Sequence, residues 1–195
     1  MKIAIIIGST RPNRHGEAVA KWVYEKAVAR KDAEFELVDL KDYHLPLLDE
    51  PMSASFGQYT HPHTKKWAAK VASFDAYIFV TPEYNRSTSG ALKNAIDFLS
   101  KEWKNKAAGF VGYGGLGAAR AVEHLRGIMG ELEIADVRTQ VSFSLIHDFE
   151  NFQIFKPASP YHEKNLNKML SELIAWGGAL KSLRGQDAAK TVSQY

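Results

Sequence analysis

The sequence predicts a doubly wound α/β fold, in which helices cover both faces of a mostly parallel sheet. Two observations support this prediction. Five short apolar runs alternate along the chain with five stretches of helical periodicity. The first run, residues 2–7, is continuous and rich in isoleucine, which is typical of a strand buried on both faces. A chain of 195 residues is long enough for one domain of this kind.

The remaining elements follow in order from the same two signals. Residues 16–30 place apolar side chains three and four positions apart, which predicts the first helix, and the apolar run 35–40 predicts the second strand. A proline-containing connection, 41–62, separates this strand from a helix predicted at 64–73. Further strands are predicted at 76–80, 107–111 and 134–145, alternating with helices at 90–99, 117–130 and 163–184.

A second long connection, 147–161, is rich in phenylalanine and proline. Long connections with apolar side chains usually pack on their own domain or on a partner subunit. We expect a single domain over 1–185, and we expect the tail at 186–195 to be frayed.

The composition excludes several classes of protein. Cysteine is absent, which rules out disulfide scaffolds, thiolate nucleophiles and cysteine-ligated metals. The net charge is +3 and no run of Lys or Arg exceeds two residues, so nucleic acid is not an expected partner. No apolar stretch approaches the about 20 residues of a membrane helix, and we expect a cytoplasmic protein without a membrane partner. His61 and His63 lack a carboxylate at a ligand spacing beside them, so no metal site is predicted.

The first loop (residues 8–16) joins the first strand to the first helix and has the features of a phosphate site. Unsatisfied N–H groups and the helix dipole favour an anion at a helix N-terminus. Ser9 supplies a neutral donor, and Arg11 and Arg14 supply guanidinium groups suited to phosphate. A simple helix cap flanked by solvated arginines is the alternative interpretation.

The second loop (residues 81–90) follows the third strand and leads into another helix N-terminus. Tyr84 offers a flat ring with a polar tip, and Asn85 offers paired donor and acceptor groups. These side chains suit a planar heteroaromatic ring with amide-like edges better than a sugar or a peptide. Taken alone, the segment is also compatible with an ordinary turn.

The third loop (residues 112–117) matches the dinucleotide-binding pattern Gly-x-Gly-x-x-Gly, with Asp136 about 20 residues further on. Two features argue against that function. The pattern belongs in the first strand–helix turn, whereas this is the fourth, and Asp136 stands near the start of its strand rather than at its end. We favour the interpretation that the glycines let backbone N–H groups approach the edge of a planar ligand. An NAD-binding Rossmann enzyme is the alternative.

Together and in this order, the loops resemble those of the NAD(P)H-dependent FMN reductase family. The resemblance covers residues 1–145 and rests on Gly8-Ser9-x-Arg11, Leu45-Pro46-Leu47 with Asp49-Glu50-Pro51, Pro82-Glu83-Tyr84-Asn85-x-Ser87, and Gly90-x-Leu92-Lys93-Asn94-Ala95-Ile96-Asp97. It implies a three-layer flavodoxin-like fold whose five parallel strands have the order 2-1-3-4-5. It also implies FMN as cofactor, NADPH or NADH as electron donor, and assembly as a homodimer or homotetramer.

Carried over residue by residue, the resemblance implies which residues bind FMN. Ser9 and Arg11 are expected to hold the phosphate, and Arg14 is expected to add charge where the family often has a neutral residue. The residues expected along the ribityl chain and the isoalloxazine ring are Pro82, Glu83, Tyr84, Asn85 and Ser87. Gly114 and Gly115 are expected at the pyrimidine edge of the ring.

The implied reaction passes a hydride from NAD(P)H through bound FMN to a flavin, a quinone, an azo compound or a similar small acceptor. The cofactor supplies the chemistry, so no catalytic acid–base residue is predicted. We expect the start of the helix at 117–130 to stabilise negative charge near the ring, and Arg86 or Arg120 to meet the phosphates of the nicotinamide cofactor. The alternative from another class is a flavodoxin-like electron carrier or a flavin-binding regulatory module.

Overall fold

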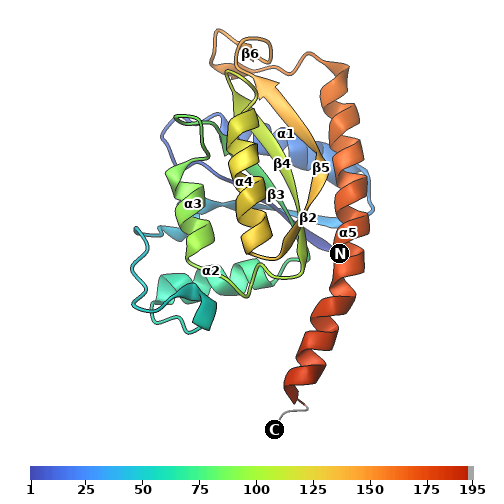
Figure 1. Ribbon diagram of the computed structural model, residues 1–195. Coiled ribbons are helices and arrows are strands. Elements are labelled where there is room, and N and C mark those ends of the chain that lie inside the picture. Colours follow the sequence, from blue (N-terminus) through green and yellow to red (C-terminus); the bar gives the residue numbers. More distant parts are fainter. Residues whose placement is uncertain (193–195) are drawn as a thin grey trace.

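The computed structural model describes residues 1–192 and places side chains for residues 1–184. Its centre is a sheet of five parallel strands in the order β2-β1-β3-β4-β5 (Figure 1). The predicted fold class and strand order are therefore confirmed. The strands are β1 (Lys2–Ile7), β2 (Glu34–Asp39), β3 (Ala76–Pro82), β4 (Lys106–Gly114) and β5 (Ile134–Ser144).

Helices fill the connections between these strands and follow the last of them. They are α1 (Gly16–Ala29), α2 (Pro62–Ala72), α3 (Gly90–Asp97), α4 (Ala119–Glu131) and α5 (Pro160–Val192). The long connections contain the 3-10 helices η1 (Leu40–Tyr43) and η2 (Ala54–Phe56) and a hairpin of β6 (Phe149–Glu150) and β7 (Ile154–Phe155). Over the described residues, no helix combines the length and the apolar character needed to cross a membrane.

The sheet separates two apolar cores, one on each face. Side chains alternate along β1, so Ile3 and Ile5 join one core while Ala4 and Ile6 join the other. Helices α1 and α5 cover the first face, and α2, α3 and α4 cover the second (Figure 1). Strands β3 and β4 are buried over their whole length, which explains why their apolar runs do not alternate with polar residues.

The strand order also determines where a ligand can bind. The chain passes from β1 to β2 on one side and then returns past β1 to β3 on the other, so the direction of winding reverses between β1 and β3. In doubly wound sheets, ligands bind beyond the carboxyl ends of the strands at this reversal point. The first and second loops follow β1 and β3, and the third loop includes the end of β4.

The last helix is longer than the sequence pattern predicts. Helix α5 continues to Val192, beyond the predicted end at 184, and extends past the sheet (Figure 1). The helix includes residues 186–192, residues 193–195 lie outside the described part of the chain, and the frayed tail at 186–195 stays a prediction. The prediction treats Gly185 as the helix end. A single glycine only weakens a helix, however, and good helix formers without proline follow it.

The two long connections pack on the cores only in part. Tyr43 and Leu45 of the first connection pack against the apolar cores, as do Phe149 and Phe155 of the second. Other large apolar side chains of these connections are exposed: Leu47, Leu48, Met52, Phe56, Phe152 and Ile154. The expected packing is thus confirmed for one set of residues, and the other set remains accessible.

A buried lysine stands at the first position of β4. Lys106 is 4% exposed, and its Nζ donates hydrogen bonds to the carbonyl of Val71 (3.0 Å) and to the hydroxyl of Tyr77 (2.8 Å). Burial lowers the pKa of Lys106 from its usual 10.5 to about 8. The lysine therefore joins the last turn of α2 to the sheet, but its charged form is poorly solvated.

This pKa makes stability depend on pH in the alkaline range. Between about pH 8 and about pH 10.5 the unfolded chain binds more protons at Lys106 than the folded chain, so the free energy of unfolding rises with pH. From about pH 7.5 to about pH 9.5 the expected rise is at most about 2 kcal/mol. Urea unfolding of the wild type and of Lys106→Met measures it, with the exposed Lys21→Met as control. The prediction fails if all three proteins show the same pH dependence.

Candidate functional site

The three loops meet in one cavity at the carboxyl edge of the sheet. Its volume is about 320 Å³, and it is lined by Arg11 from the first loop, Tyr84 from the second and Gly114 from the third. Arg14, Pro82 and Glu83 also line it, so six of the ten residues predicted to bind the cofactor surround one space. The other four lie elsewhere.

Ser9 is buried, with its hydroxyl 3.1 Å from the hydroxyl of Tyr84, so it joins the first loop to the second. Asn85 and Gly115 are exposed and do not line the cavity. Ser87 lines a separate groove between α3 and α4, where its Oγ is 2.9 Å from Nδ1 of His124.

The first loop is held close to the end of β3. The N–H of Gly8 donates to the carbonyl of Val80 (2.8 Å), and a Cβ at position 8 would lie 2.7 Å from that oxygen, so only glycine fits there. The buried hydroxyl of Ser89 donates to the carbonyl of Gly8 and accepts from the N–H of Leu92 (3.1 Å). Ser89 is thus the N-cap of α3 and a connection between two loops. This connection was not predicted, although a serine before a helix is a capping signal.

Arg14 does not offer the free charge that was expected of it. Its side chain is only 3% exposed, Nη1 donates to the carbonyl of Ser9 (2.8 Å), and Nη2 contacts the carboxylates of Glu17 and Asp39. These carboxylates neutralise the charge of Arg14, and its contact with a phosphate stays a prediction. Asp39 is the last residue of β2, which pairs with β1 in the sheet. That Asp39 lies close to the first loop can therefore be inferred only once the strand order is known.

The second loop contains a tight two-residue turn. Tyr84 and Ser87 exchange backbone hydrogen bonds of 2.9 and 3.0 Å, and the residues between them have positive φ angles, 48° for Asn85 and 70° for Arg86. Asparagine tolerates this left-handed conformation, whereas arginine rarely adopts it. The turn places both residues at an exposed tip, which explains why Asn85 does not line the cavity.

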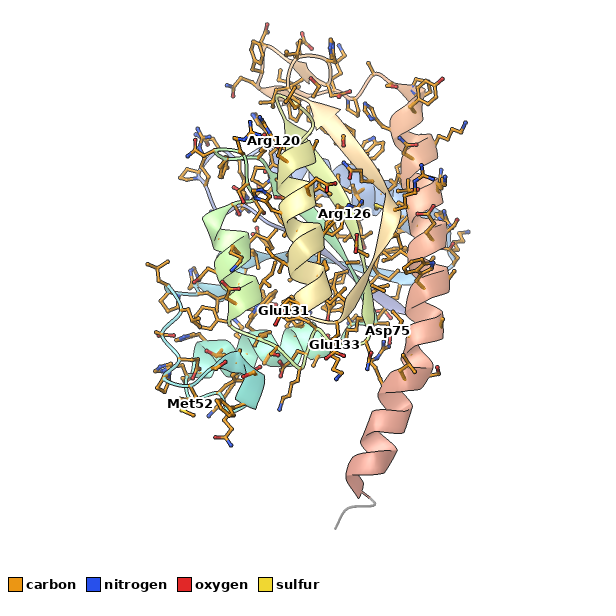
Figure 2. The ribbon with its side chains drawn as sticks, in the orientation of Figure 1. Met52, Asp75, Arg120, Arg126, Glu131 and Glu133 are labelled. Atoms are coloured by element: carbon orange, nitrogen blue, oxygen red, sulfur yellow. The ribbon has the colours of Figure 1, made fainter. Side chains whose placement is uncertain are left out.

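Glu83 has a structural role in addition to the predicted contact with the cofactor, which stays a prediction. Its buried carboxylate accepts hydrogen bonds from the backbone N–H groups of Arg120 (3.1 Å) and Ala121 (3.4 Å) and forms an ion pair with the Arg120 guanidinium. Figure 2 shows Arg120 at the end of α4 that lies nearest this edge of the sheet. Burial acts to raise the pKa of Glu83, but the hydrogen bonds from Arg120 outweigh it and hold the pKa below the usual value.

Two expectations about α4 are corrected by this contact. The N–H groups at the start of α4 bind Glu83, so they are not available to stabilise negative charge near a flavin. The Arg120 side chain is paired with the same carboxylate, so it does not stand free for the phosphates of a nicotinamide cofactor. Arg86 remains the unpaired candidate, since no side-chain partner is found for it within residues 1–184.

Two of the glycines of the third loop, Gly112 and Gly117, serve internal packing. A Cβ at Gly112 would lie 2.6 Å from the carbonyl oxygen of Gly117, and one at Gly117 would lie 2.7 Å from Cβ of Ser142. These glycines let the loop fold tightly against β5. Because Glu83 also occupies the start of the following helix, the dinucleotide-binding alternative for this loop is wrong.

A carboxylate from a distant part of the sequence lies beside the histidine pair His61 and His63. Nε2 of His63 is 3.0 Å from Oδ1 of Asp49, and the His61 and His63 rings stack with centroids 5.2 Å apart. Across the described side chains, no group of three or more His, Asp or Glu residues is arranged to hold a metal ion.

The fold and the cavity define a class of protein, the flavodoxin-like α/β proteins. At the carboxyl edge of its sheet, this chain places a helix N-terminus together with the side chains of an arginine and a tyrosine. The family described as NADPH-dependent FMN reductase matches residues 1–148, and the chain belongs to this family. The match agrees with the resemblance seen over residues 1–145. The chain is therefore a flavin-dependent NAD(P)H oxidoreductase with FMN as its cofactor, and the electron-carrier alternative does not hold.

Individual relatives agree with this assignment. An NAD(P)H-dependent FMN reductase of Schizosaccharomyces pombe is 35% identical over 175 residues, which cover 88% of each chain. A 2-hydroxy-1,4-benzoquinone reductase of a Burkholderia species is 32% identical over 155 residues, which cover 76% of this chain and 80% of that one. Among solved structures, the flavoenzyme NAD(P)H:(acceptor) oxidoreductase FerB of Paracoccus denitrificans has the same fold, with a TM-score of 0.71 at 23% identity over 91% of this chain and 97% of that one.

Proposed function

We propose that the cavity binds FMN with its phosphate at the first loop, and that the enzyme uses it to reduce a small quinone-type acceptor. The observation that carries the proposal is the convergence of all three loops on one cavity that contains Arg11. The residues present fit the cofactor. The guanidinium of Arg11 lines the cavity and forms no ion pair among the described residues. A guanidinium without a counter-ion suits a phosphate, so the donors of the cavity fit the phosphate of FMN.

In this proposal Arg11 binds the phosphate, while Pro82, Tyr84 and Gly114 enclose the rest of the cofactor. Ser9 does not line the cavity, and its contact with the phosphate stays a prediction of the family resemblance. Arg14 and Glu83 hold the loops in position through their ion pairs. Contacts of Asn85, Ser87 and Gly115 with FMN remain predictions of the family resemblance. When bound, FMN supplies the transfer of electrons from NAD(P)H to the acceptor, so no side chain is assigned as a catalytic acid or base.

The surroundings of the cavity support an apolar acceptor. Three residues that line the cavity, Gly114, Leu145 and Gln153, have a large exposed apolar residue next to them or two positions away in the sequence. These apolar residues are Leu116, Ile146 and Phe152. Figure 1 shows the hairpin that carries Phe152 at the same end of the sheet as the three loops. Exposed apolar groups around a cofactor site favour a flat, weakly polar substrate such as a quinone, which is the substrate class of the Burkholderia relative.

The experiment that tests this function uses the purified chain with and without added FMN. We expect a flavin absorbance spectrum after removal of free FMN, and NAD(P)H oxidation that depends on both bound FMN and a benzoquinone. A protein that retains no flavin would refute the proposed site. A protein that retains flavin but does not oxidise NAD(P)H with any quinone would refute the proposed reaction.

We also propose a homodimer, formed at the groove between α3 and α4. The groove has a volume of about 670 Å³ and is lined on α4 by His124, Gly127, Ile128 and Glu131, which recur at helical spacing. Figure 2 shows Glu131 at the end of α4 opposite Arg120. A Cβ at Gly127 would have no atom within 4 Å, so the chain's own packing does not require glycine there. Glycine in a helix costs about 1 kcal/mol relative to alanine, and close approach of a second copy explains its presence.

The dimer is tested by filling the groove. Gly127→Leu is expected to shift the protein from dimer to monomer in sedimentation experiments at micromolar concentration. Gly178→Leu is the matched control, because Gly178 is also a helical glycine at which a Cβ would have no atom within 4 Å, but it lies on α5. A monomeric wild type, or an unchanged dimer in Gly127→Leu, would exclude this interface.

We place the enzyme in the cytoplasm. A chain without cysteine needs no oxidising compartment for its folding. Its electron donor, NAD(P)H, is supplied by cytoplasmic metabolism. Fractionation of cells that express the tagged chain tests this placement.

A further inference from the structure

Phe152 has a backbone conformation that large apolar residues rarely adopt. It lies in the turn that joins β6 to β7, in which the N–H of Gln153 donates to the carbonyl of Glu150 (3.0 Å). The two central residues of this turn, Asn151 and Phe152, have positive φ angles of 52° and 58°. Turns with positive φ at both central positions usually contain asparagine followed by glycine. Asparagine therefore fits the first position, whereas phenylalanine is strained at the second.

Burial within the fold does not offset this strain. Phe152 is 60% exposed, so its ring contributes little to the apolar cores. Among the described residues that have positive φ and are not glycine, it is the only one with a large apolar side chain. Strained residues cluster at ligand-binding sites, where a contact with the ligand requires the side chain that the fold disfavours. The conformation of Phe152 therefore indicates a contact outside the folded chain.

The hairpin that carries Phe152 is fixed to the body of the domain. The ring of Phe149 in β6 is buried and lies 4.8 Å, between centroids, from the ring of His15, which lines the cavity. Directly before β6, the carboxylate of Asp148 is 2.7 Å from Nε2 of His162 in the first turn of α5. Because the hairpin is anchored in this way, the exposed ring of Phe152 is held at a defined place.

That place is the rim of the cavity assigned to FMN. Gln153, which follows Phe152 in the turn, lines the cavity. Figure 1 shows the hairpin at the end of the sheet where the three loops meet. An exposed aromatic ring at this rim offers a flat apolar surface next to the cofactor site, and such a surface suits offset stacking with another planar ring.

We propose that Phe152 is a specificity-determining residue for the electron acceptor, and that its ring stacks on a planar quinone bound beside FMN. The inference rests on the proposed function and names the side chain that selects the substrate class. It explains why phenylalanine occupies a turn position that glycine would fit better. It also implies that a naphthoquinone, with its larger fused ring, gains more from this contact than a benzoquinone does.

The test measures kcat/KM of the FMN-loaded protein for three acceptors at saturating NADPH: a naphthoquinone, a benzoquinone and ferricyanide, which has no ring. Phe152→Gly removes the aromatic side chain. Its kcat/KM is expected to fall about three- to tenfold for the naphthoquinone, to fall less for the benzoquinone and to stay unchanged for ferricyanide. Phe152→Tyr keeps the ring and is expected to retain the wild-type preference for the naphthoquinone.

The melting temperature separates this role from a structural one. That of Phe152→Gly is expected to stay the same or to rise, because glycine adopts positive φ without strain. Lys31→Gly is the matched control: Lys31 is also exposed and has a positive φ of 61°, but it lies shortly before β2, at the opposite edge of the sheet. This control is expected to leave kcat/KM unchanged for all three acceptors.

Three results would overturn the inference while leaving the FMN site intact. They are unchanged naphthoquinone kinetics in Phe152→Gly, an equal loss for all three acceptors, and dissociation of an oligomer by Phe152→Gly, which would assign the ring to a subunit contact. A wild type that retains no FMN, or that reduces no quinone, would instead refute the proposed function, and the inference with it.

Discussion

Replacing Arg11 with alanine is expected to weaken FMN binding about ten- to a hundredfold. The reason is the loss of a charge-assisted hydrogen bond of about 1.5–3 kcal/mol to the phosphate. Arg11 lines the cavity, and in the described part of the chain its side chain forms no ion pair, unlike that of Arg14. It is therefore the arginine of the first loop whose charge is available to a ligand.

The measurement is a fluorescence titration of the apoprotein with FMN at constant ionic strength. Arg11→Lys keeps the charge but loses the planar fork, so it should fall between the wild type and Arg11→Ala. Arg138→Ala removes the same charge from an exposed position on β5 and should leave the affinity close to that of the wild type. If Arg11→Ala retains FMN as the wild type does, the phosphate is not bound at the first loop.

Replacing Glu83 with alanine is expected to lower the free energy of unfolding by about 2 kcal/mol and to weaken FMN binding as well. The substitution leaves the N–H groups of Arg120 and Ala121 without an acceptor and the Arg120 guanidinium without a counter-ion. The estimate is at the low end for a broken buried ion pair, because the Arg120 side chain is 36% exposed and remains partly solvated.

Glu83→Gln separates the two functions of this side chain. Glutamine keeps an acceptor for the backbone N–H groups of α4 but has no charge, so it should recover part of the lost stability. Urea unfolding measures stability, and FMN titration of the folded variants measures the effect on the site. Glu83→Ala with the stability of the wild type would contradict the role of Glu83 as the cap of α4. Lost FMN binding without lost stability would favour a direct contact with the cofactor, as the family resemblance implies.

The location of the site could be predicted from sequence to a useful degree, but the contacts of its side chains could not. The first, second and third loops were each recognisable, because a strand end followed by a helix start is a local pattern. Arg11 and Tyr84 do line the cavity. Arg14 and Glu83 line it too, but their charged groups pair with Asp39 and Arg120, which lie 25 and 37 positions away in the sequence.

Tyr113 is a residue whose contacts could not be predicted from the sequence. In the sequence it is an aromatic residue within a glycine-rich pattern, and nothing nearby indicates a polar role. The packing of β4 against α1 brings its hydroxyl to Gly16, which is 97 positions earlier in the chain. Only this packing shows that the hydroxyl is buried at the start of α1.

The sequence by itself determined the strands, most of the helix bounds and the edge of the sheet at which the three loops meet, and its likeness to a known family supplied the strand order. These depend on hydrophobic periodicity, on turn residues and on the handedness of strand–helix–strand connections, all of which are encoded within short segments. The tertiary structure decided which charges remain free and which N–H groups are capped. Those outcomes depend on distances between atoms far apart along the chain, because a charge or a donor is available to a ligand only when no nearer group has already bound it.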